Sequence, residues 1–329
     1  MKHFLHNHRK SILGLALQGA VLFVLVFAVV WGVTYGISMA SPASAGPGTT
    51  TSGPAAAAAV APRVAQPEPQ PVPAAWLGLS GSLRAMVGTP DAIRSDATFA
   101  LLAPDTGIAD PGVHQTGLST PSGDSFYVVA MHPYDPQRGA MIGSYHVGSW
   151  PAPTGNPMYA RPPGVIEVTP DNESTPVSRH FQLRDFLTHD QGSVWPKALV
   201  IRPKLIDKLE LISQELERRG LPSKLHVMSG FRTPQYNALE VRPGGRARLS
   251  RHMYGDASDV YVDADGNGQM DDLNGDGKAT IADARVLFQV AESVEASHPE
   301  LTGGLSAYPA TVAHGPFVHV DTRGKRARW

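Results

Sequence analysis

Two histidine-containing segments in the second half of this chain constrain its fold more than any other feature. The first is the stretch Ser250–Asp259, which reads S-x-H-x-x-G-x-A-x-D and separates His252 from Asp259 by a turn of small residues. The second is the stretch 314–321, in which His319 lies between two valines in an alternation typical of a β-strand. We therefore expect the fold to bring two segments that are distant in the sequence to one point.

These side chains indicate a metal site. Two histidines and one carboxylate are the ligand set of a catalytic zinc ion whose fourth position is open to water. The chain has 329 residues and no cysteine, which excludes disulfides and thiolate ligands. The small residues Gly255 and Ala257 would keep the intervening turn tight enough for Asp259 to return to the same point as His252. We expect Zn2+ to be held by His252, Asp259 and His319.

The N-terminal region indicates a membrane anchor. Basic residues among positions 1–10 precede an almost wholly apolar run, Ile12–Met39, which exceeds the roughly 20 residues needed to cross a bilayer. The positive flank predicts a cytoplasmic N-terminus. Residues 1–40 are therefore expected to be a single-pass anchor in a bacterial inner membrane, with the remainder in the periplasm or cell-wall space. The alternative is a cleaved signal peptide with an A-x-A site at 43–45, which would release a secreted form.

The composition divides the remainder of the chain into three parts. Residues 41–75 are rich in Ala, Pro, Gly and Ser, which predicts a disordered, partly polyproline linker. Residues 76–162 are expected to form a small β-rich module, because short β-like runs alternate with Pro, Gly and Asp turns. Residues 163–329 contain the metal-site motifs and are expected to form the catalytic domain. The β-like runs of the module are residues 98–102, 126–131 and 140–145.

Several elements are predicted ahead of the metal motifs. Residues 163–203 are expected to be mostly irregular, apart from a short helix at 181–187. Residues 204–219 have the spacing of an amphipathic helix, which Gly220 would terminate. A strand at 225–228 follows. The apolar face of the predicted helix consists of Leu205, Leu209, Ile212 and Leu216.

Arg232 lies in the segment Ser229–Asn237, which follows the predicted strand and reads S-G-F-R-T-P-Q-Y-N. This position places a guanidinium group at a strand end beside a turn. Arginine suits the binding of a carboxylate or of a developing oxyanion. A structural ion pair is the alternative role for this residue.

The segments 229–237, 250–259, 314–324 and 327–329 occur in the order found in a known family. From roughly residue 176 onward the chain resembles the bacterial zinc D-alanyl-D-alanine carboxypeptidases and murein endopeptidases. This family belongs to the group that also contains lysostaphin-type enzymes, D-Ala-D-Ala metallopeptidases and the sonic hedgehog fold. The resemblance implies an α+β fold in which a hedgehog-like or D-Ala-D-Ala-peptidase-like antiparallel sheet has flanking helices. It also implies a zinc peptidase that hydrolyses peptide bonds in peptidoglycan stem peptides or cross-links, as an endopeptidase or a carboxypeptidase, in cell-wall remodelling.

The resemblance also assigns roles around the three zinc ligands. Some branches of the family carry a catalytic Glu three residues before the last zinc His, but Pro316 occupies that position here. Other branches carry a His five residues before it, and His314 matches that position. His314 is thus expected to be the general base or to stabilise the intermediate, and its ordinary pKa near 6.5 suits the task. Arg232 would bind a substrate carboxylate or the oxyanion, and Asp321 would either support a ligand or be structural.

An acidic insert at 263–283 predicts calcium binding. From Asp272 it reads D-x-N-x-D-G-x-x-x-x-x-D, which is typical of an EF-hand or dockerin loop and precedes a predicted helix at 281–297. A second, partial loop begins at Asp263, and an exposed acidic turn without metal is the alternative for both. The main-loop ligands would be Asp272, Asn274, Asp276, the Lys278 carbonyl, Thr280 and Asp283. The partial-loop ligands would be Asp263, Asp265, Asn267 and Asp271.

Three classes of function remain open from the sequence. A net charge of −1 argues against a nucleic-acid partner, which a basic face would normally bind. A zinc peptidase with peptidoglycan peptides as partners explains the complete ligand set. A non-catalytic zinc-containing module that binds the cell wall would explain the missing Glu at position 316. A calcium-dependent adhesion or assembly protein would explain the acidic insert.

Overall fold

The computed structural model describes residues 70–97, 99, 110–120, 122–135, 139–152, 155–241 and 245–329. The predicted membrane anchor and residues 41–69 of the predicted linker lie outside this part of the chain and stay predictions. The remaining residues of that range contain the short strand β1 (Gln70–Pro71) and the 3-10 helix η1 (Ala74–Trp76). In the residues that the structure describes, no helix is both long and apolar enough to span a bilayer.

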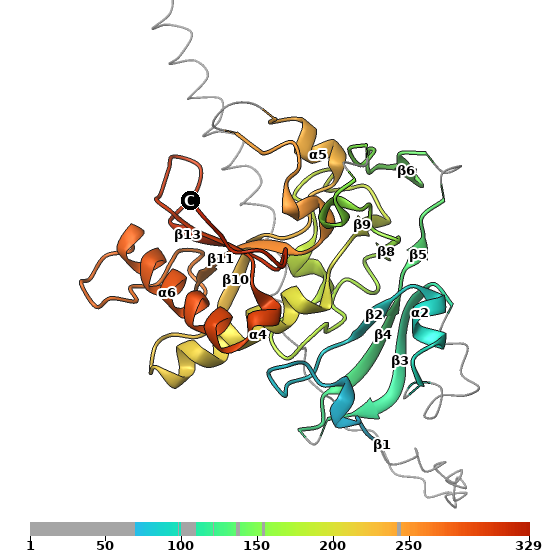
Figure 1. The fold of residues 1–329 in the computed structure, drawn as a ribbon, viewed down its shortest axis with the longest axis horizontal. Helices are drawn as coiled ribbons and strands as arrows, with labels where there is room; N and C mark the ends of the chain where they lie inside the picture. Colours follow the sequence, from blue (N-terminus) through green and yellow to red (C-terminus); the bar gives the residue numbers. More distant parts are fainter. Residues whose placement is uncertain are drawn as a thin grey trace, which may run out of the picture. The chain divides into compact units, whose positions relative to one another are not determined.

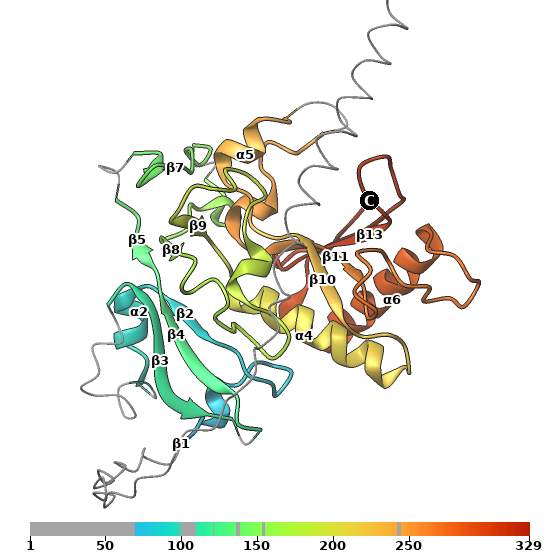
Figure 2. The same ribbon diagram turned by 180° about the vertical axis from the view of Figure 1, so that it is seen from behind.

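The first sheet has the strand order β1-β3-β4-β2 and lies beside the short helix α2 (Pro90–Arg94) (Figures 1 and 2). The central pair β3 and β4 is antiparallel, and each has a parallel neighbour at the edge. The predicted strand at 126–131 is confirmed, whereas the prediction of a strand at 98–102 is wrong at Phe99, which is helical. The three longer strands are β2 (Met86–Gly88), β3 (Gly112–Ser119) and β4 (Ser125–Ala130). The buried core of this sheet includes Val72, Trp76, Leu83, Ile93, Phe99, Leu118, Phe126, Val128 and Ala130.

Two further predictions need correction. The run at 140–145 is a hairpin of two short strands rather than one strand, because Gly143 turns the chain with φ 54°. Residues 163–203 were expected to be mostly irregular but contain two strands. The predicted short helix at 181–187 is a 3-10 turn, η4 (Leu183–Phe186). The hairpin strands are β6 (Met141–Ile142) and β7 (Tyr145–His146). The missed strands are β8 (Gly164–Val168) and β9 (Lys197–Leu199), which form a sheet with β5 (His132–Pro133).

The second half of the chain forms a five-stranded sheet in the order β10-β11-β13-β12-β14. Its first four strands are antiparallel neighbours, and β14 runs parallel to β12 at the edge. The helices α4 (Pro203–Arg218) and α6 (Ile281–Ser297) pack on each other, and α6 packs on the sheet (Figure 1). The class is thus mixed α+β, as predicted. The strands are β10 (Leu225–Ser229), β11 (Ala257–Val262), β12 (Gly304–Tyr308), β13 (Phe317–Asp321) and β14 (Ala327–Arg328).

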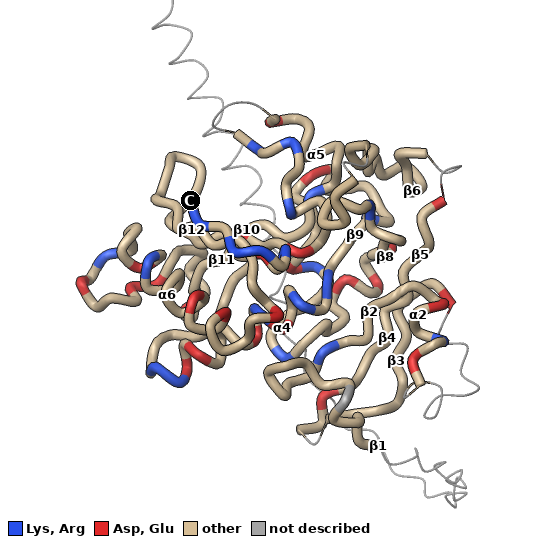
Figure 3. Tube along the Cα trace, in the orientation of Figure 1, with Lys and Arg blue, Asp and Glu red and all other residues tan. Residues whose placement is uncertain are grey.

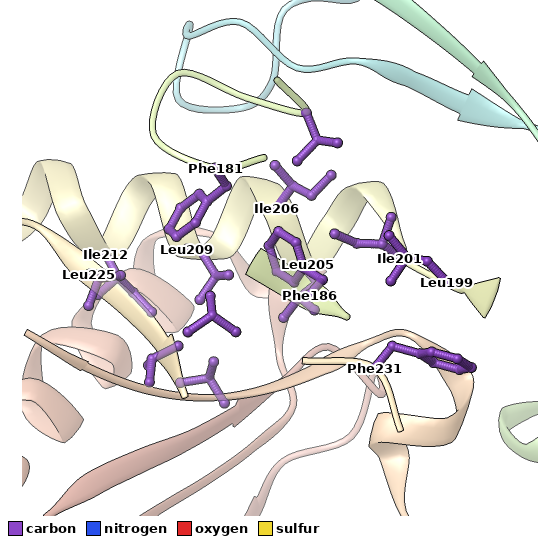
Figure 4. Close-up of a cluster of buried hydrophobic side chains, with 14 of the residues drawn as sticks. Phe181, Phe186, Leu199, Ile201, Leu205, Ile206, Leu209, Ile212, Leu225 and Phe231 are labelled. Carbon is purple, nitrogen blue, oxygen red and sulfur yellow. The ribbon is translucent and has the colours of Figure 1, made fainter. Parts of the chain in front are cut away.

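Helix α4 organises the main core (Figure 4). The four positions of its predicted apolar face are all buried, and Ile206 is buried beside them. Burial of each such side chain contributes about 1.5–3 kcal/mol to folding. The labelled neighbours in this cluster are Phe181, Phe186, Leu199, Ile201, Leu225 and Phe231.

Polar residues of α4 are buried as well, which an amphipathic pattern does not predict. Arg84 of the first sheet region reaches Asp207 at 2.7 Å. Lys208 is fully buried, and its Nζ donates to Glu295 Oε1 of α6 at 2.5 Å and to the Asp321 main-chain oxygen of β13 at 2.7 Å. Helix α4 is therefore covered on several sides, and charged groups join it to its neighbours.

We expect Lys208→Ala to lower the free energy of unfolding by about 2–4 kcal/mol, because Glu295 keeps Arg328 but loses its ammonium partner, and two buried carbonyls lose their donor. Urea unfolding followed by circular dichroism measures this. Lys204→Ala on the same helix is the matched control. Lys204 is exposed and makes one 3.3 Å contact to a carbonyl, so its loss is expected to cost less than about 0.5 kcal/mol. Equal effects of the two variants would contradict a stabilising role for the buried pair.

Candidate zinc site

The register of three strands aligns the centre of the site. Ser229 of β10 lies opposite Asp259 of β11, and Asp259 lies opposite His319 of β13. Residues directly opposite in neighbouring antiparallel strands place their side chains on one face of the sheet. The ladder therefore brings Asp259 and His319 together, although they are far apart in the sequence.

His252 reaches the same point from the 3-10 helix η5 (Arg251–Tyr254). Gly255 ends this turn in the left-handed conformation with φ 70°. A Cβ at this position would also lie only 2.5 Å from the Val200 carbonyl oxygen, so glycine is required on two grounds. The tight turn allows the chain to enter β11 within a few residues of His252, as the spacing of the motif predicts.

The three ligand-type atoms converge on one point. His252 Nε2 lies 3.3 Å from His319 Nδ1 and 3.3 Å from Asp259 Oδ1. His319 Nδ1 lies 2.9 Å from the same carboxylate oxygen. Ligand atoms at about 2.0–2.1 Å from a tetrahedral zinc ion are themselves about 3.3 Å apart. The donor set and its spacing therefore fit zinc.

Hydrogen bonds on the far side of each ring select the tautomer that binds metal. His252 Nδ1 donates to the Gly230 carbonyl at 2.7 Å, which leaves the Nε2 lone pair directed into the site. His319 Nε2 donates to Asp321 Oδ2 at 3.1 Å, which leaves Nδ1 directed into the site. Partners of this kind orient metal-ligating histidines and raise their basicity. A side chain at Gly230 would meet the backbone of Phe186 at 2.6 Å, so this carbonyl is held in close packing.

The electrostatics of the site keep Asp259 ionised beside the two histidines. Burial lowers the pKa of His252, and the positive charge of Arg232 lowers it further. Burial acts to lower the pKa of His319, but its hydrogen bonds to Asp259 and Asp321 outweigh that effect and raise it. Burial acts to raise the pKa of Asp259, but the two histidines hold it well below the ordinary value. Asp259 is therefore a carboxylate, which is the form that binds metal.

Arg232 contacts the site from the turn after β10. Its Nη2 donates to Asp259 Oδ2 at 2.5 Å and its Nε donates to Ser229 Oγ at 2.9 Å. The guanidinium thus orients the oxygen of Asp259 that faces away from the two imidazoles. These contacts are those of a structural ion pair, which is the alternative role predicted for Arg232. A contact between Arg232 and substrate stays a prediction.

Asp321 is fully buried behind His319 and has further partners. Its Oδ1 accepts hydrogen bonds from Gly304 N at 2.8 Å and from Arg323 N at 3.1 Å. Burial acts to raise the pKa of Asp321, but the bonds to His319 and Arg323 lower it strongly. Asp321 therefore supports the zinc ligand and ties β13 to β12 at the same time.

The three ligand residues line a cleft of about 910 Å3. His314 also lines it, from the loop between β12 and β13, and its Nδ1 donates to the Gly315 carbonyl at 2.8 Å. Several arginines lie along the cleft, and Figure 3 shows basic positions in blue around α5 (Pro234–Ala238). The basic lining residues are Arg232, Arg246, Arg251 and Arg323. Each of them is paired with a carboxylate, namely Asp259, Glu240, Asp256 and Asp321 in the same order.

Some residues of the cleft were not singled out in the sequence. Tyr159 lies in the range predicted to be the small β module, yet it lines the cleft and its ring is 5.7 Å from that of Tyr254. Trp150 from the same range donates through Nε1 to the Met253 carbonyl at 2.8 Å, next to His252. No motif marks these contacts, because they arise only when the 147–161 segment packs on η5.

The carboxylates of the acidic insert accept hydrogen bonds mainly from main-chain amides of the same insert. Asp272 Oδ1 accepts from Gly275 N at 2.8 Å and Oδ2 from Gly277 N at 2.6 Å. Asp283 is fully buried, caps α6 and accepts from the Leu273 and Asn274 amides.

In the part of the chain that the structure describes, the carboxylates of Asp272, Asp276 and Asp283 do not gather at one point. Those of the partial loop do: ligand atoms of Asp263, Asp265 and Asp271 lie within 4.8 Å of one another. The sequence favours the main loop over the partial loop as a calcium site. The structure instead clusters the carboxylates of the partial loop. Calcium in either loop stays a prediction.

Comparison with known proteins gives one match. Residues 183–270 match the model of a family described as Peptidase_M15_2, Peptidoglycan L,D-endopeptidase MepK. The matched region contains Arg232, His252 and Asp259 and ends before His314 and His319. This part of the chain is therefore similar to a family whose description names a peptidoglycan endopeptidase. No curated protein and no solved structure matches the chain.

We expect Asp321→Asn to weaken zinc binding by about 10- to 100-fold, because loss of such a partner leaves the ligating histidine less basic and less well oriented. Competition with a chelator of known affinity measures this. Asp276→Asn is the matched control, because Asp276 is exposed in the acidic insert and should not affect zinc affinity. Unchanged affinity in a folded Asp321→Asn protein would contradict the role given to this carboxylate.

Proposed function

We propose that this chain is a zinc peptidase that hydrolyses peptide bonds in the cross-links or stem peptides of peptidoglycan. The observation that carries the proposal is the convergence of His252, Asp259 and His319 at 2.9–3.3 Å on the floor of a large cleft. Zinc held there supplies an activated water and polarises the scissile carbonyl. The family match over 183–270 supports the same substrate class.

The residues around the three ligands have different roles. Arg232 holds Asp259, while the Gly230 carbonyl and Asp321 hold the two imidazoles with the correct nitrogen directed inward. His314 Nδ1 donates to a carbonyl, so Nε2 is free to accept the proton of the attacking water. The same nitrogen then returns that proton to the amine that leaves. The hydrogen bonds that orient the three ligand residues are present before substrate binds, which lowers the cost of reaching the transition state.

We further propose that the enzyme is an endopeptidase. The cleft has a volume of about 910 Å3, and Arg246 and Tyr308 line it together with the metal ligands. The matching family model is described as an L,D-endopeptidase, which favours the same reaction. A carboxypeptidase is the second outcome, and the products distinguish the two.

Digestion of purified, cross-linked muropeptides followed by mass spectrometry tests the proposal. The full-length chain with zinc is expected to split cross-linked dimers, and His252→Ala is expected to lose zinc and activity together. His314→Gln is expected to keep zinc and to lower kcat by about 10²–10⁴-fold, because proton transfer contributes a factor of that size. Release of single terminal residues would instead identify a carboxypeptidase. Tight binding without cleavage by the zinc-loaded chain would identify a binding module.

We propose a structural role for calcium in the acidic insert, on the basis of the three clustered carboxylates of Asp263, Asp265 and Asp271. Calcium at a concentration 100 times its Kd would stabilise the fold by about 2.7 kcal/mol. Thermal unfolding with and without Ca2+ measures this as a rise in Tm. Asp265→Asn should reduce the rise, and Asp276→Asn should not. The same rise in both variants would place calcium elsewhere or exclude this loop.

We also propose that the N-terminal apolar run anchors the enzyme in the inner membrane, with the catalytic region on the periplasmic side. The support is its length and its basic flank. Membrane fractionation of cells that express the full chain tests this. The chain should remain in the membrane pellet after alkaline extraction. Recovery of a shorter soluble form would show that the segment is a cleaved signal.

A further inference from the structure

Trp329 is a large apolar side chain that remains 57% exposed while it lines the zinc cleft. Among the described residues, the other large apolar side chains of comparable exposure do not line this cleft. These are Leu79, Met141, Leu239, Val241 and Val312. An exposed aromatic side chain inside a cleft is a feature that substrate contact would explain.

Several contacts fix the position of this residue. Strand β14 pairs with β12, and Arg328 Nη2 binds Glu295 of α6 at 2.5 Å. The Trp329 main-chain oxygen accepts from Ser306 Oγ at 2.5 Å, and its Nε1 donates to Tyr308 Oη at 2.5 Å. The ring is therefore preorganised, and little conformational entropy is lost when a ligand packs on it.

The ring lies beside one of the candidate metal ligands. Its centroid is 5.3 Å from that of His319, at an interplanar angle of 49°. A peptide that lies in the cleft against His319 would therefore have Trp329 as a neighbour.

The chemistry of the surroundings selects the kind of group that can bind. The indole N–H is already bonded to Tyr308, so the ring offers no free donor. The Arg323 guanidinium lies 5.4 Å from the ring centre, but its Nε is bonded to Asp321 at 2.9 Å. The negative face of an aromatic ring disfavours a carboxylate and favours C–H groups.

We propose that Trp329 forms a specificity subsite next to the scissile bond. It takes the methyl or methylene group of a small aliphatic residue of the stem peptide, such as alanine. This inference rests on the proposed function, because it names the part of a peptidoglycan peptide that the ring contacts. The subsite discriminates between substrates by apolar contact.

The test compares peptides that carry either alanine or glycine next to the scissile bond. The full-length zinc enzyme and its Trp329→Ala, Trp329→Phe and Leu79→Ala variants are assayed. We expect Trp329→Ala to lower kcat/KM for the alanine peptide by about 10- to 100-fold, mainly through KM, because an apolar contact of this size is lost. Its kcat/KM for the glycine peptide should change less than threefold. Trp329→Phe should keep most of the preference, and Leu79→Ala, which removes an exposed side chain outside the cleft, should behave as the wild type.

Binding provides a second readout that does not depend on turnover. Fluorescence titration of the zinc-loaded His314→Gln protein with the alanine peptide gives a Kd, which Trp329→Ala in that background should raise about 10-fold or more. If peptides are bound with this dependence but not cleaved by the wild type, the proposed catalytic function fails and the subsite stands. If peptides are cleaved and Trp329→Ala leaves the alanine preference unchanged, the subsite is overturned and the function stands. If peptides are neither bound nor cleaved, both are overturned.

Discussion

The buried carboxylate of Asp321 is the interaction on which the zinc site and its supporting sheet both depend. It accepts the Nε2–H of His319, the amide of Gly304 and the guanidinium of Arg323. The main-chain oxygen of the same residue accepts from Lys208 Nζ of α4. One residue thus joins a metal ligand, the neighbouring strand and the helix that organises the core. A buried carboxylate is tolerable only when its oxygens are satisfied in this way.

The same network explains why β12 can approach β13 so closely. A Cβ at Gly304 would lie 2.4 Å from Asp321 Oδ2, so the strand needs glycine at the point where its amide donates to that carboxylate. The close approach places Ser306 opposite His319 in the ladder. Ser306 then holds the Trp329 main chain, and Tyr308 holds its indole. The aromatic wall of the cleft is therefore positioned by the strand that supports the metal ligand.

The three candidate ligands could be selected from the sequence because each lies in a short pattern. The turn between His252 and Asp259 and the alternation around His319 are short-range patterns, and the ladder between β11 and β13 then brings the three side chains together. The helix at 204–219 follows from its period, and α4 begins and ends within one residue of the prediction. These features need no knowledge of what packs against them.

The groups that orient the ligands could not be predicted, because they depend on tertiary contacts. The Gly230 carbonyl bonds His252 only after β10 lies beside β11, and the sequence shows nothing of a main-chain acceptor. The polar side of α4 has the pattern of an exposed face, yet the first sheet region and α6 cover it. Lys208 can be buried there because Glu295 and two main-chain carbonyls accept hydrogen bonds from its ammonium group.

The residues of the site come from two separate parts of the chain, which the pairing of β11 with β13 brings together. Arg232, His252 and Asp259 lie within the region that matches the family model, whereas His319 and Trp329 lie beyond its end. The acidic insert, α6 and β12 lie between the two halves, and the insert satisfies its carboxylates largely from its own amides. The hydrogen bonds between β11 and β13 set the position of His319 on one side, and β12 holds the other side of β13 through the bond from Gly304 to Asp321. The two halves of the site therefore meet where these three strands pair, and the aromatic wall depends on the same strand β12.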